Sequence, residues 1–223
     1  MNKRIYLCLA HMGGKEQMYI KEAFDTNWVV PLGPNVNGFE KDLETFVGED
    51  KRVVVLSAGT AAVHLALLAC GVGAGDEVLV QSFTFCASSH PITYLGATPV
   101  FVDSEPYTWN MDPELLEEAI KDRIRKTGKK PKAIIPVALY GMPYDCDRII
   151  EIANRYDIPV IEDAAEGFGS KYKGQVLGTF GRYGVLSFNG NKMITTSGGG
   201  ALICPDAEQW QRVMWYATQA RES

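Results

Sequence analysis

Residues 53–81 read VVVLSAGTAAVHLALLACGVGAGDEVLVQ and contain two short apolar runs, joined by a turn of small residues and a helix-like stretch. The runs 53–57 and 77–81 are predicted to be buried strands, with a helix over 60–70 between them. A strand, a helix and a second strand in this order are typical of a parallel sheet, because parallel strands need a crossover connection.

The same alternation continues along the chain. Further strands are predicted at 99–103, 133–139, 159–163, 184–188 and 200–204. Further helices are predicted near 112–126 and 145–156, with others near 15–25, 38–47 and 206–220. Strands that are apolar throughout and separated by helices indicate a mostly parallel sheet covered on both faces, so the prediction is one α/β domain.

Composition excludes several classes of protein. The 223 residues are 46% hydrophobic and 22% charged, which is ordinary for a soluble globular protein. A net charge of −5 argues against nucleic-acid binding, and the longest apolar stretch, 61–74, is too short for a membrane span. The apolar part of the N-terminus, 5–10, has no convincing cleavage site, so no signal peptide is predicted.

The cysteines and histidines point to a cytoplasmic, metal-free protein. Five cysteines are scattered singly, Cys8 among them, and an odd number without a pattern indicates reduced thiols rather than a disulfide framework. The three histidines have no ligand spacing with cysteines or carboxylates, which argues against a structural metal.

A first candidate site is the turn SAGT at 57–60, which leads into the predicted helix. Small residues at a helix N-terminus leave backbone N–H groups open to an anion, here those of Gly59 and Thr60. A plain turn with Thr60 as the N-cap explains this feature equally well. The glycines of 71–75 follow a helix and precede a strand, the wrong order for a dinucleotide-binding turn.

Carboxylates follow two of the predicted strands. Asp163 ends the strand 159–163, and Asp103 ends the strand 99–103. A carboxylate at a strand end can hold a cationic ring nitrogen, but either aspartate can also cap a turn. The sequence leaves both residues as candidates.

Lys192 lies in the irregular segment SFNGNKMITTSGGG, 187–200, between two predicted buried strands. Most lysines are surface residues, but here Ser187 and the nearby asparagines and glycines supply turns and hydrogen-bond donors. A lysine whose pKa is lowered by its surroundings can attack a carbonyl. Phe85, after the strand 77–81, would stack on a planar ring, with core packing as the competing explanation.

These features together are what a protein must provide to pyridoxal phosphate. They comprise an anion-binding helix start, a flat aromatic, a carboxylate for the ring nitrogen and a reactive lysine. The basic run 123–132 is a separate feature. It is either a phosphate patch or a solvated helix end, and the second interpretation is favoured because cations suit a helix C-terminus.

Several motifs resemble the DegT/DnrJ/StrS sugar aminotransferases, which are fold-type I pyridoxal phosphate enzymes. The motifs are SAGTAA at 57–62, SFTF at 82–85, EDAAE at 162–166, GTFG at 178–181 and SFNGNK at 187–192. The resemblance runs from HMGG at 11–14 and PLG at 31–33 to TQARE at 218–222. It implies a pyridoxal phosphate-binding large domain with a mostly parallel seven-stranded sheet and helices on both faces.

The resemblance also implies a substrate class. Residues 189–200 are most similar to the branch that makes UDP-bacillosamine precursors for glycan and polysaccharide biosynthesis. That branch aminates C4 of a UDP-linked 4-keto-6-deoxy-N-acetylhexosamine and uses glutamate as the amino donor. Ser197-Gly198 stand where many members have Gly-Glu, which favours this narrow branch.

Roles for individual residues follow from the resemblance. Lys192 would bond covalently to the cofactor and then carry a proton between cofactor and substrate carbon. Asp163 would pair with the pyridine nitrogen, and Phe85 would stack on the ring. The backbone N–H groups of Gly59 and Thr60 would hold the phosphate.

Two further cofactor-binding residues are implied. The Ser187 hydroxyl would lie beside the phosphate. Glu166 occupies the position near the 3′-oxygen of the cofactor where glutamine or histidine is commoner in the family. Glutamate suits the bacillosamine and perosamine branches, and its hydrogen-bonding role stays open.

The family also sets expectations for domains and partners. Residues 1–223 correspond to the large domain, with 1–50 leading into it, and the small C-terminal domain of the family is absent. Family members are homodimers whose active site borrows groups from the partner subunit, so the 223-residue chain, as a shortened form, is expected to be weak or inactive alone.

Three alternatives remain. One is another fold-type I pyridoxal phosphate enzyme, such as a 3-keto sugar aminotransferase, a lyase or a desulfurase. A dehydratase subgroup replaces the lysine with histidine, and Lys192 argues against it. The last is a non-catalytic regulatory relative, against which Lys192, Asp163, Ser187 and Thr60 all speak.

Overall fold

Seven strands form two hydrogen-bonded sheets that meet edge to edge. The computed structural model describes residues 4, 10–48 and 50–220. One sheet has the strand order β1-β9-β8-β5, and the other has the order β3-β2-β4. Their bounds are β1 (Arg52–Leu56), β2 (Glu77–Gln81), β3 (Thr98–Val102), β4 (Ala133–Ile135), β5 (Ile161–Asp163), β8 (Tyr183–Ser187) and β9 (Gly200–Cys204). Strand β9 is antiparallel to both of its neighbours, and the other strand pairs are parallel.

The junction of the two sheets lies between β4 and β5. Two isolated parallel bridges join them, Ile134 to Val160 and Val137 to Asp163. The predicted strand 133–139 ends at Ile135, since Pro136 has no N–H group to donate to a ladder. All seven predicted strands are therefore present, but the mostly parallel seven-stranded sheet is interrupted at this point and contains one reversed strand.

Alternate residues of each strand face two different cores. Val53 and Leu79 belong to one buried cluster, whereas their neighbours Val54, Val78 and Val80 belong to the other. Successive side chains of a strand point to opposite faces, so a sheet with a core on each face is covered on both sides. This confirms the α/β class predicted from the apolar runs.

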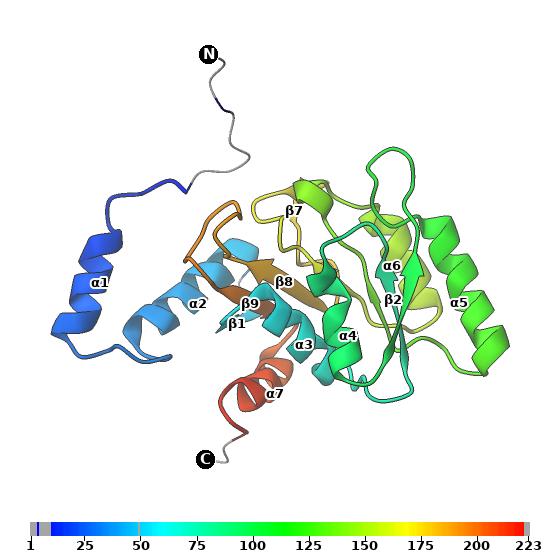
Figure 1. Cartoon of the computed structure of the whole chain (residues 1–223), viewed down its shortest axis with the longest axis horizontal. Coiled ribbons are helices and arrows are strands. Elements are labelled where there is room, and N and C mark those ends of the chain that lie inside the picture. Colours follow the sequence, from blue (N-terminus) through cyan, green and yellow to red (C-terminus); the bar gives the residue numbers. More distant parts are fainter. Residues whose placement is uncertain (1–3, 5–9, 49, 221–223) are drawn as a thin grey trace.

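Helices cover both faces (Figure 1). The first face carries buried residues of α2 (Pro34–Val47), α5 (Pro113–Thr127) and α6 (Cys146–Arg155). The second carries those of α3 (Gly59–Ala69), α4 (His90–Tyr94) and α7 (Ala207–Ala217). Helix α5 begins as its sequence predicts, with the Asp112 side chain accepting hydrogen bonds from the N–H groups of Glu114 and Leu115.

Short elements escaped the sequence prediction. They are α4, the 3₁₀ turns η1 (Cys86–Ser88) and η2 (Leu139–Gly141), and the hairpin of β6 (Lys171–Tyr172) and β7 (Gln175–Val176). Within the described residues, no helix has both the length and the apolar character needed to cross a bilayer. Cys70, Cys86, Cys146 and Cys204 are free thiols. Cys8 and most of the 5–10 stretch lie outside the described residues.

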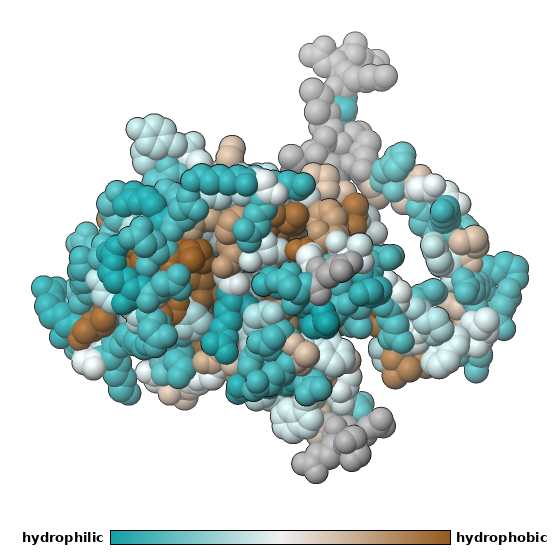
Figure 2. Space-filling model, turned by 180° about the vertical axis from the view of Figure 1, so that it is seen from behind, coloured by the Kyte–Doolittle hydropathy of each residue, from teal (hydrophilic) through white to brown (hydrophobic). Residues whose placement is uncertain are grey.

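Helix α1 (Glu16–Asp25) stands apart from the sheet (Figure 1) and buries none of its residues. Large apolar side chains along 18–32 are exposed, among them Met18, Ile20, Phe24 and Val29. In the view from behind, this segment projects beside the body and shows both hydrophilic and hydrophobic residues (Figure 2). The segment 18–32 therefore carries large apolar side chains that the other described residues leave exposed.

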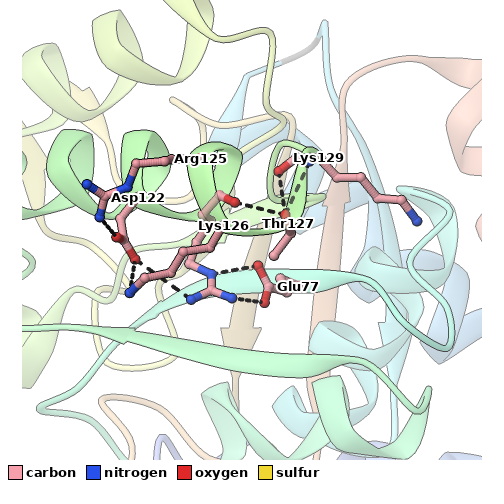
Figure 3. Close-up of polar contacts among 7 residues, drawn as sticks. Glu77, Asp122, Arg125, Lys126, Thr127 and Lys129 are labelled. Carbon is pink, nitrogen blue, oxygen red and sulfur yellow. Dashed lines mark hydrogen bonds and ion pairs between the residues drawn. The ribbon is translucent and has the colours of Figure 1, made fainter.

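Several cations of the basic run 123–132 pair with acidic neighbours at the end of α5 (Figure 3). Asp122 pairs with Arg125 at 2.6 Å and with Lys126 at 2.9 Å. Arg123 makes a two-pronged ion pair with Glu77, through Nε at 2.9 Å and Nη2 at 2.7 Å. These contacts favour a solvated helix end over a phosphate patch.

Candidate active site

The predicted site residues gather at one edge of the sheet. Asp163 ends β5 and Ser187 ends β8, and parallel strands place their carboxyl ends at the same edge. The turn before α3 follows β1, which runs parallel to β8 because both are antiparallel to β9. Lys192 lies in the connection from β8 to β9, which starts from the same edge.

The N-terminus of α3 is open and lies directly on the ends of β8 and β9. The N-cap is Ala58, which makes no side-chain bond, so the alternative that Thr60 caps the helix is wrong. A Cβ on Gly59 would lie 3.0 Å from Ser187 Cβ, and one on Gly200 would lie 2.4 Å from Gly59 N. Only glycine permits this approach, which brings the free N–H groups of the first turn beside the Ser187 hydroxyl.

Asp163 is a buried carboxylate, only 5% exposed. Its Oδ2 accepts a hydrogen bond from Ser88 Oγ at 2.6 Å, and its Oδ1 accepts one from Ala165 N at 3.1 Å. Burial raises the pKa of Asp163, while these two hydrogen bonds and the charge of Lys192 act in the opposite direction. A buried carboxylate of this kind favours a cationic partner.

Asp103, the other candidate carboxylate, is exposed. Its Oδ1 accepts hydrogen bonds from Ser104 N at 2.8 Å and from Ser82 Oγ at 3.2 Å. These are the contacts of a turn cap. Burial and the nearby lysine charge therefore select Asp163 over Asp103.

Lys192 faces Glu166. Lys192 Nζ lies 3.3 Å from Glu166 Oε1, and the two side chains are 13% and 28% exposed. The second carboxylate oxygen of Glu166 accepts a hydrogen bond from Tyr140 N at 2.7 Å. Lys192 N donates to Asn189 O at 3.0 Å, which closes a turn under the side chain.

Phe85 is 74% exposed, so the alternative that it packs in the core is wrong. It immediately precedes η1, whose last residue, Ser88, donates to Asp163. Phe85 itself has an extended backbone and precedes the turn, whereas Ser88 is buried. No sequence pattern singles out Ser88, because its role depends on a contact with a residue 75 positions away in the chain.

Glu162, next to Asp163, is buried on the opposite face of β5. Its carboxylate accepts hydrogen bonds from the N–H groups of Gly178 at 2.9 Å, Phe180 at 2.5 Å and Gly181 at 2.8 Å. Burial raises the pKa of Glu162, and the three N–H donors oppose that rise. The GTFG motif is therefore the loop that satisfies Glu162, which points away from Lys192.

The residues present fit a cofactor with a phosphate and a flat cationic ring. The open helix start and Ser187 suit a phosphate, and the buried Asp163 suits a ring N–H group. Across the described part of the chain, no group of three or more histidine, cysteine or carboxylate side chains is arranged to hold a metal ion.

Known aminotransferases are similar to this chain in sequence and in fold. EpsN of Bacillus subtilis, named as a pyridoxal phosphate-dependent aminotransferase, is 52% identical over 222 residues, which is 100% of this chain and 57% of EpsN. The UDP-2-acetamido-2-deoxy-3-oxo-D-glucuronate aminotransferase of Pseudomonas aeruginosa is 44% identical over 178 residues, 79% of this chain and 47% of the relative.

Among solved structures, Spr1654 of Streptococcus pneumoniae, named as a sugar aminotransferase and solved in a PMP form, superimposes with a TM-score of 0.85. It is 31% identical, over 95% of this chain and 56% of its own. The chain thus spans about half the length of the curated relatives it matches. The family model for the DegT/DnrJ/EryC1/StrS aminotransferases matches residues 10–223, and the chain belongs to that family.

Proposed function

We propose that this chain binds pyridoxal phosphate at the described sheet edge and serves amino-group transfer to a nucleotide-linked keto sugar. The observation that supports this best is that Lys192, the buried Asp163 and an uncapped helix start lie at the same edge of the sheet. Aminotransferases need all three functions, namely a reactive amine, a carboxylate for the ring nitrogen and a phosphate anchor.

Each residue has a defined task in this proposal. The N–H groups of Gly59 and Thr60 and the Ser187 hydroxyl hold the phosphate, since a helix N-terminus attracts anions. Asp163 holds the ring nitrogen protonated, and the exposed Phe85 ring covers one face of the cofactor. The bound cofactor supplies a carbonyl that accepts the amino group and a ring that takes up electrons.

Lys192 would hold the cofactor covalently through its side-chain amine and would carry a proton at Nζ during amino-group transfer. It is placed for both tasks in a turn between two buried strands, with most of its side chain shielded from water. Glu166 orients Nζ from one side. The charge of Lys192 acts to lower the pKa of Asp163, against the larger effect of burial.

The proposed acceptor is a UDP-linked 4-keto-6-deoxy-N-acetylhexosamine, and the proposed donor is glutamate. A relative at 44% identity is named for a UDP-linked acetamido sugar, which supports the nucleotide and the sugar class. The same name carries a 3-oxo group, so amination at C3 is the competing proposal. Amination at C4 rests on the motif 189–200 and on glutamate at position 166.

Residues 1–223 are proposed to be the cofactor-binding large domain of a homodimer that works in the cytoplasm. The exposed apolar side chains of 18–32 support a partner subunit, because a partner would cover large apolar side chains that are gathered in one segment. The relatives extend well past the matched region, so full activity is proposed for the dimer that includes the second domain.

The visible absorption of bound cofactor tests the proposal. Addition of pyridoxal phosphate is expected to give a protein-bound band that is absent in Lys192→Ala. The band should persist in Lys126→Ala, a matched control whose lysine pairs with Asp122 on the surface. Loss of the nucleophile is expected to reduce transamination by about a thousandfold or more.

Acceptor profiling completes the test. The UDP-linked 4-keto and 3-keto sugars, each with glutamate, should separate the two proposals by the position of the new amine. A dimeric protein extended through the second domain that shows no cofactor band would overturn the proposed function.

A further inference from the structure

The side chain of a buried asparagine, Asn110, binds the backbone on both sides of Tyr140, whose N–H group contacts Glu166. Asn110 is fully buried and lies in the loop between β3 and α5. Its Oδ1 accepts a hydrogen bond from Leu139 N at 3.1 Å, and its Nδ2 donates to Met142 O at 3.0 Å. One side chain therefore holds the backbone on both sides of Tyr140.

A second buried amide, Gln81 at the end of β2, supports the first. Gln81 Nε2 donates to Phe83 O at 2.9 Å and, at 3.4 Å, to Asn110 Oδ1. Gln81 Oε1 accepts from Met111 N at 2.8 Å and from Val137 N at 3.3 Å. The two amides thus tie together the loops that follow β2, β3 and β4.

Tyr140 needs such support. Its φ of 50° and ψ of 26° lie in the left-handed region, which residues with a side chain seldom adopt. Its own ring is 76% exposed, so packing of the side chain does not hold this conformation. A strained backbone persists where its surroundings over-determine it. Here the backbone bonds from Gly141 N to Ala138 O and from Met142 N to Leu139 O close the turn, and the two hydrogen bonds to Asn110 fix it to the sheet edge.

The conformation of Tyr140 determines where its N–H group points. That group donates to Glu166 Oε2 at 2.7 Å, and the other oxygen of the same carboxylate lies 3.3 Å from Lys192 Nζ. We propose that Asn110, supported by Gln81, is a positioning residue that sets the Glu166 carboxylate against the Lys192 amine through Tyr140. The inference rests on the roles of Lys192 and Glu166 in the proposed function.

A competing explanation is that the buried amides of Asn110 and Gln81 only stabilise the loops after β2, β3 and β4. The two explanations differ in what happens to Lys192, because a purely structural role would leave its chemical reactivity unchanged in the folded protein. The readout is therefore the rate at which an amine-specific acylating reagent labels Lys192 in the cofactor-free full chain, measured by mass spectrometry at neutral pH.

Three variants form a double-mutant cycle. Glu166→Gln removes the charge beside Nζ and is expected to raise the labelling rate about threefold, the size typical of a partly exposed ion pair. Asn110→Ser removes both bonds that bracket Tyr140 and is expected to raise the rate in the same direction. The double variant should match Glu166→Gln alone, because Asn110 acts through Glu166.

Two further variants keep the test decisive. Asn110→Ala removes the same two hydrogen bonds and introduces no charge, so it provides an independent change should Asn110→Ser fold poorly. Val213→Ala in α7 removes buried packing on the opposite face of the sheet and should leave the labelling rate of Lys192 unchanged.

Additive effects in the cycle, or an unchanged rate in both folded Asn110 variants, would overturn the inference. Failure of the parent chain to bind pyridoxal phosphate in its dimeric, extended form would count against the proposed function instead. The labelling cycle does not depend on that binding, so the two failures are distinguishable.

Discussion

The buried carboxylate of Asp163 is proposed to be needed for cofactor binding, but it lowers the stability of the folded chain. Burial raises the pKa of Asp163 above its ordinary value of 3.8. Between that value and the raised one, the folded chain binds more protons than the unfolded chain. The free energy of unfolding therefore decreases as the pH rises through this window and stays lower above it.

Replacement of this carboxylate should stabilise the cofactor-free chain. Asp163→Asn can keep hydrogen bonds with Ser88 and Ala165 and no longer has to ionise. We expect a gain of about 0.5–2 kcal/mol at pH 7–8, together with a loss of cofactor affinity. Urea denaturation at several pH values measures this, and the gain should shrink toward pH 4.

Asp103→Asn is the matched control, because that carboxylate is exposed and caps a turn. Its effect on stability should stay within about 0.5 kcal/mol. An Asp163→Asn variant less stable than the parent at neutral pH would show that the carboxylate's hydrogen bonds outweigh its burial.

For single residues, the sequence predicts which side chains belong to the site better than it predicts how buried each one is. Lys192, Asp163 and the helix start were predicted from their places after apolar runs, and the structure brings them to one edge. The strand pattern alone leaves Asp163 and Asp103 equivalent, because both end a strand. The family resemblance favours Asp163, and burial in the structure distinguishes the two. The N–H group of Tyr140 has no sequence signal, since almost every residue carries one.

Among the elements, the start of α3 depends on its fit against β9. A Cβ on Gly200 would lie 2.3 Å from the carbonyl carbon of Ala58, which is a backbone atom. No flexible side chain can move aside to relieve this contact. The phosphate-binding geometry proposed for Gly59 and Thr60 therefore requires glycine at position 200.

Gly200→Ala should displace the helix start. We expect a loss of about 1–3 kcal/mol in stability from overpacking and a weaker affinity for pyridoxal phosphate. Thermal denaturation and a cofactor titration measure the two effects. Gly73→Ala, where a Cβ would meet nothing within 4 Å, should change neither. Equal behaviour of the two variants would refute the steric argument.

Strands and helices with strong apolar periodicity were predicted to within a few residues. The end of β4 was not, because the apolar residues continue past Pro136 while the ladder stops there. The hairpin of β6 and β7 and the short α4 were missed, since two to five residues are too few for a periodic pattern to emerge.

On the scale of the whole molecule, the apolar surface of 18–32 predicts association. If it lies in the proposed dimer interface, Phe24→Lys should raise the dimer dissociation constant about tenfold or more, because an aromatic anchor is replaced by a charge. Sedimentation velocity over a range of concentrations measures this. Gln17→Lys adds the same charge to the same helix at an exposed polar position and should leave association unchanged. A parent that remains monomeric at all concentrations would contradict the prediction.

The pairing of β1 with β9 joins Arg52 to Cys204, across most of the chain. The anion-binding turn after β1 is thus completed by residues made some 140 positions later, and loops of this length close slowly. On the ribosome, the first half of the chain would emerge with the anion-binding turn but without β8 and β9, which pack against it. Competence for the cofactor should therefore appear late in synthesis, after β9 has left the exit tunnel and closed the sheet.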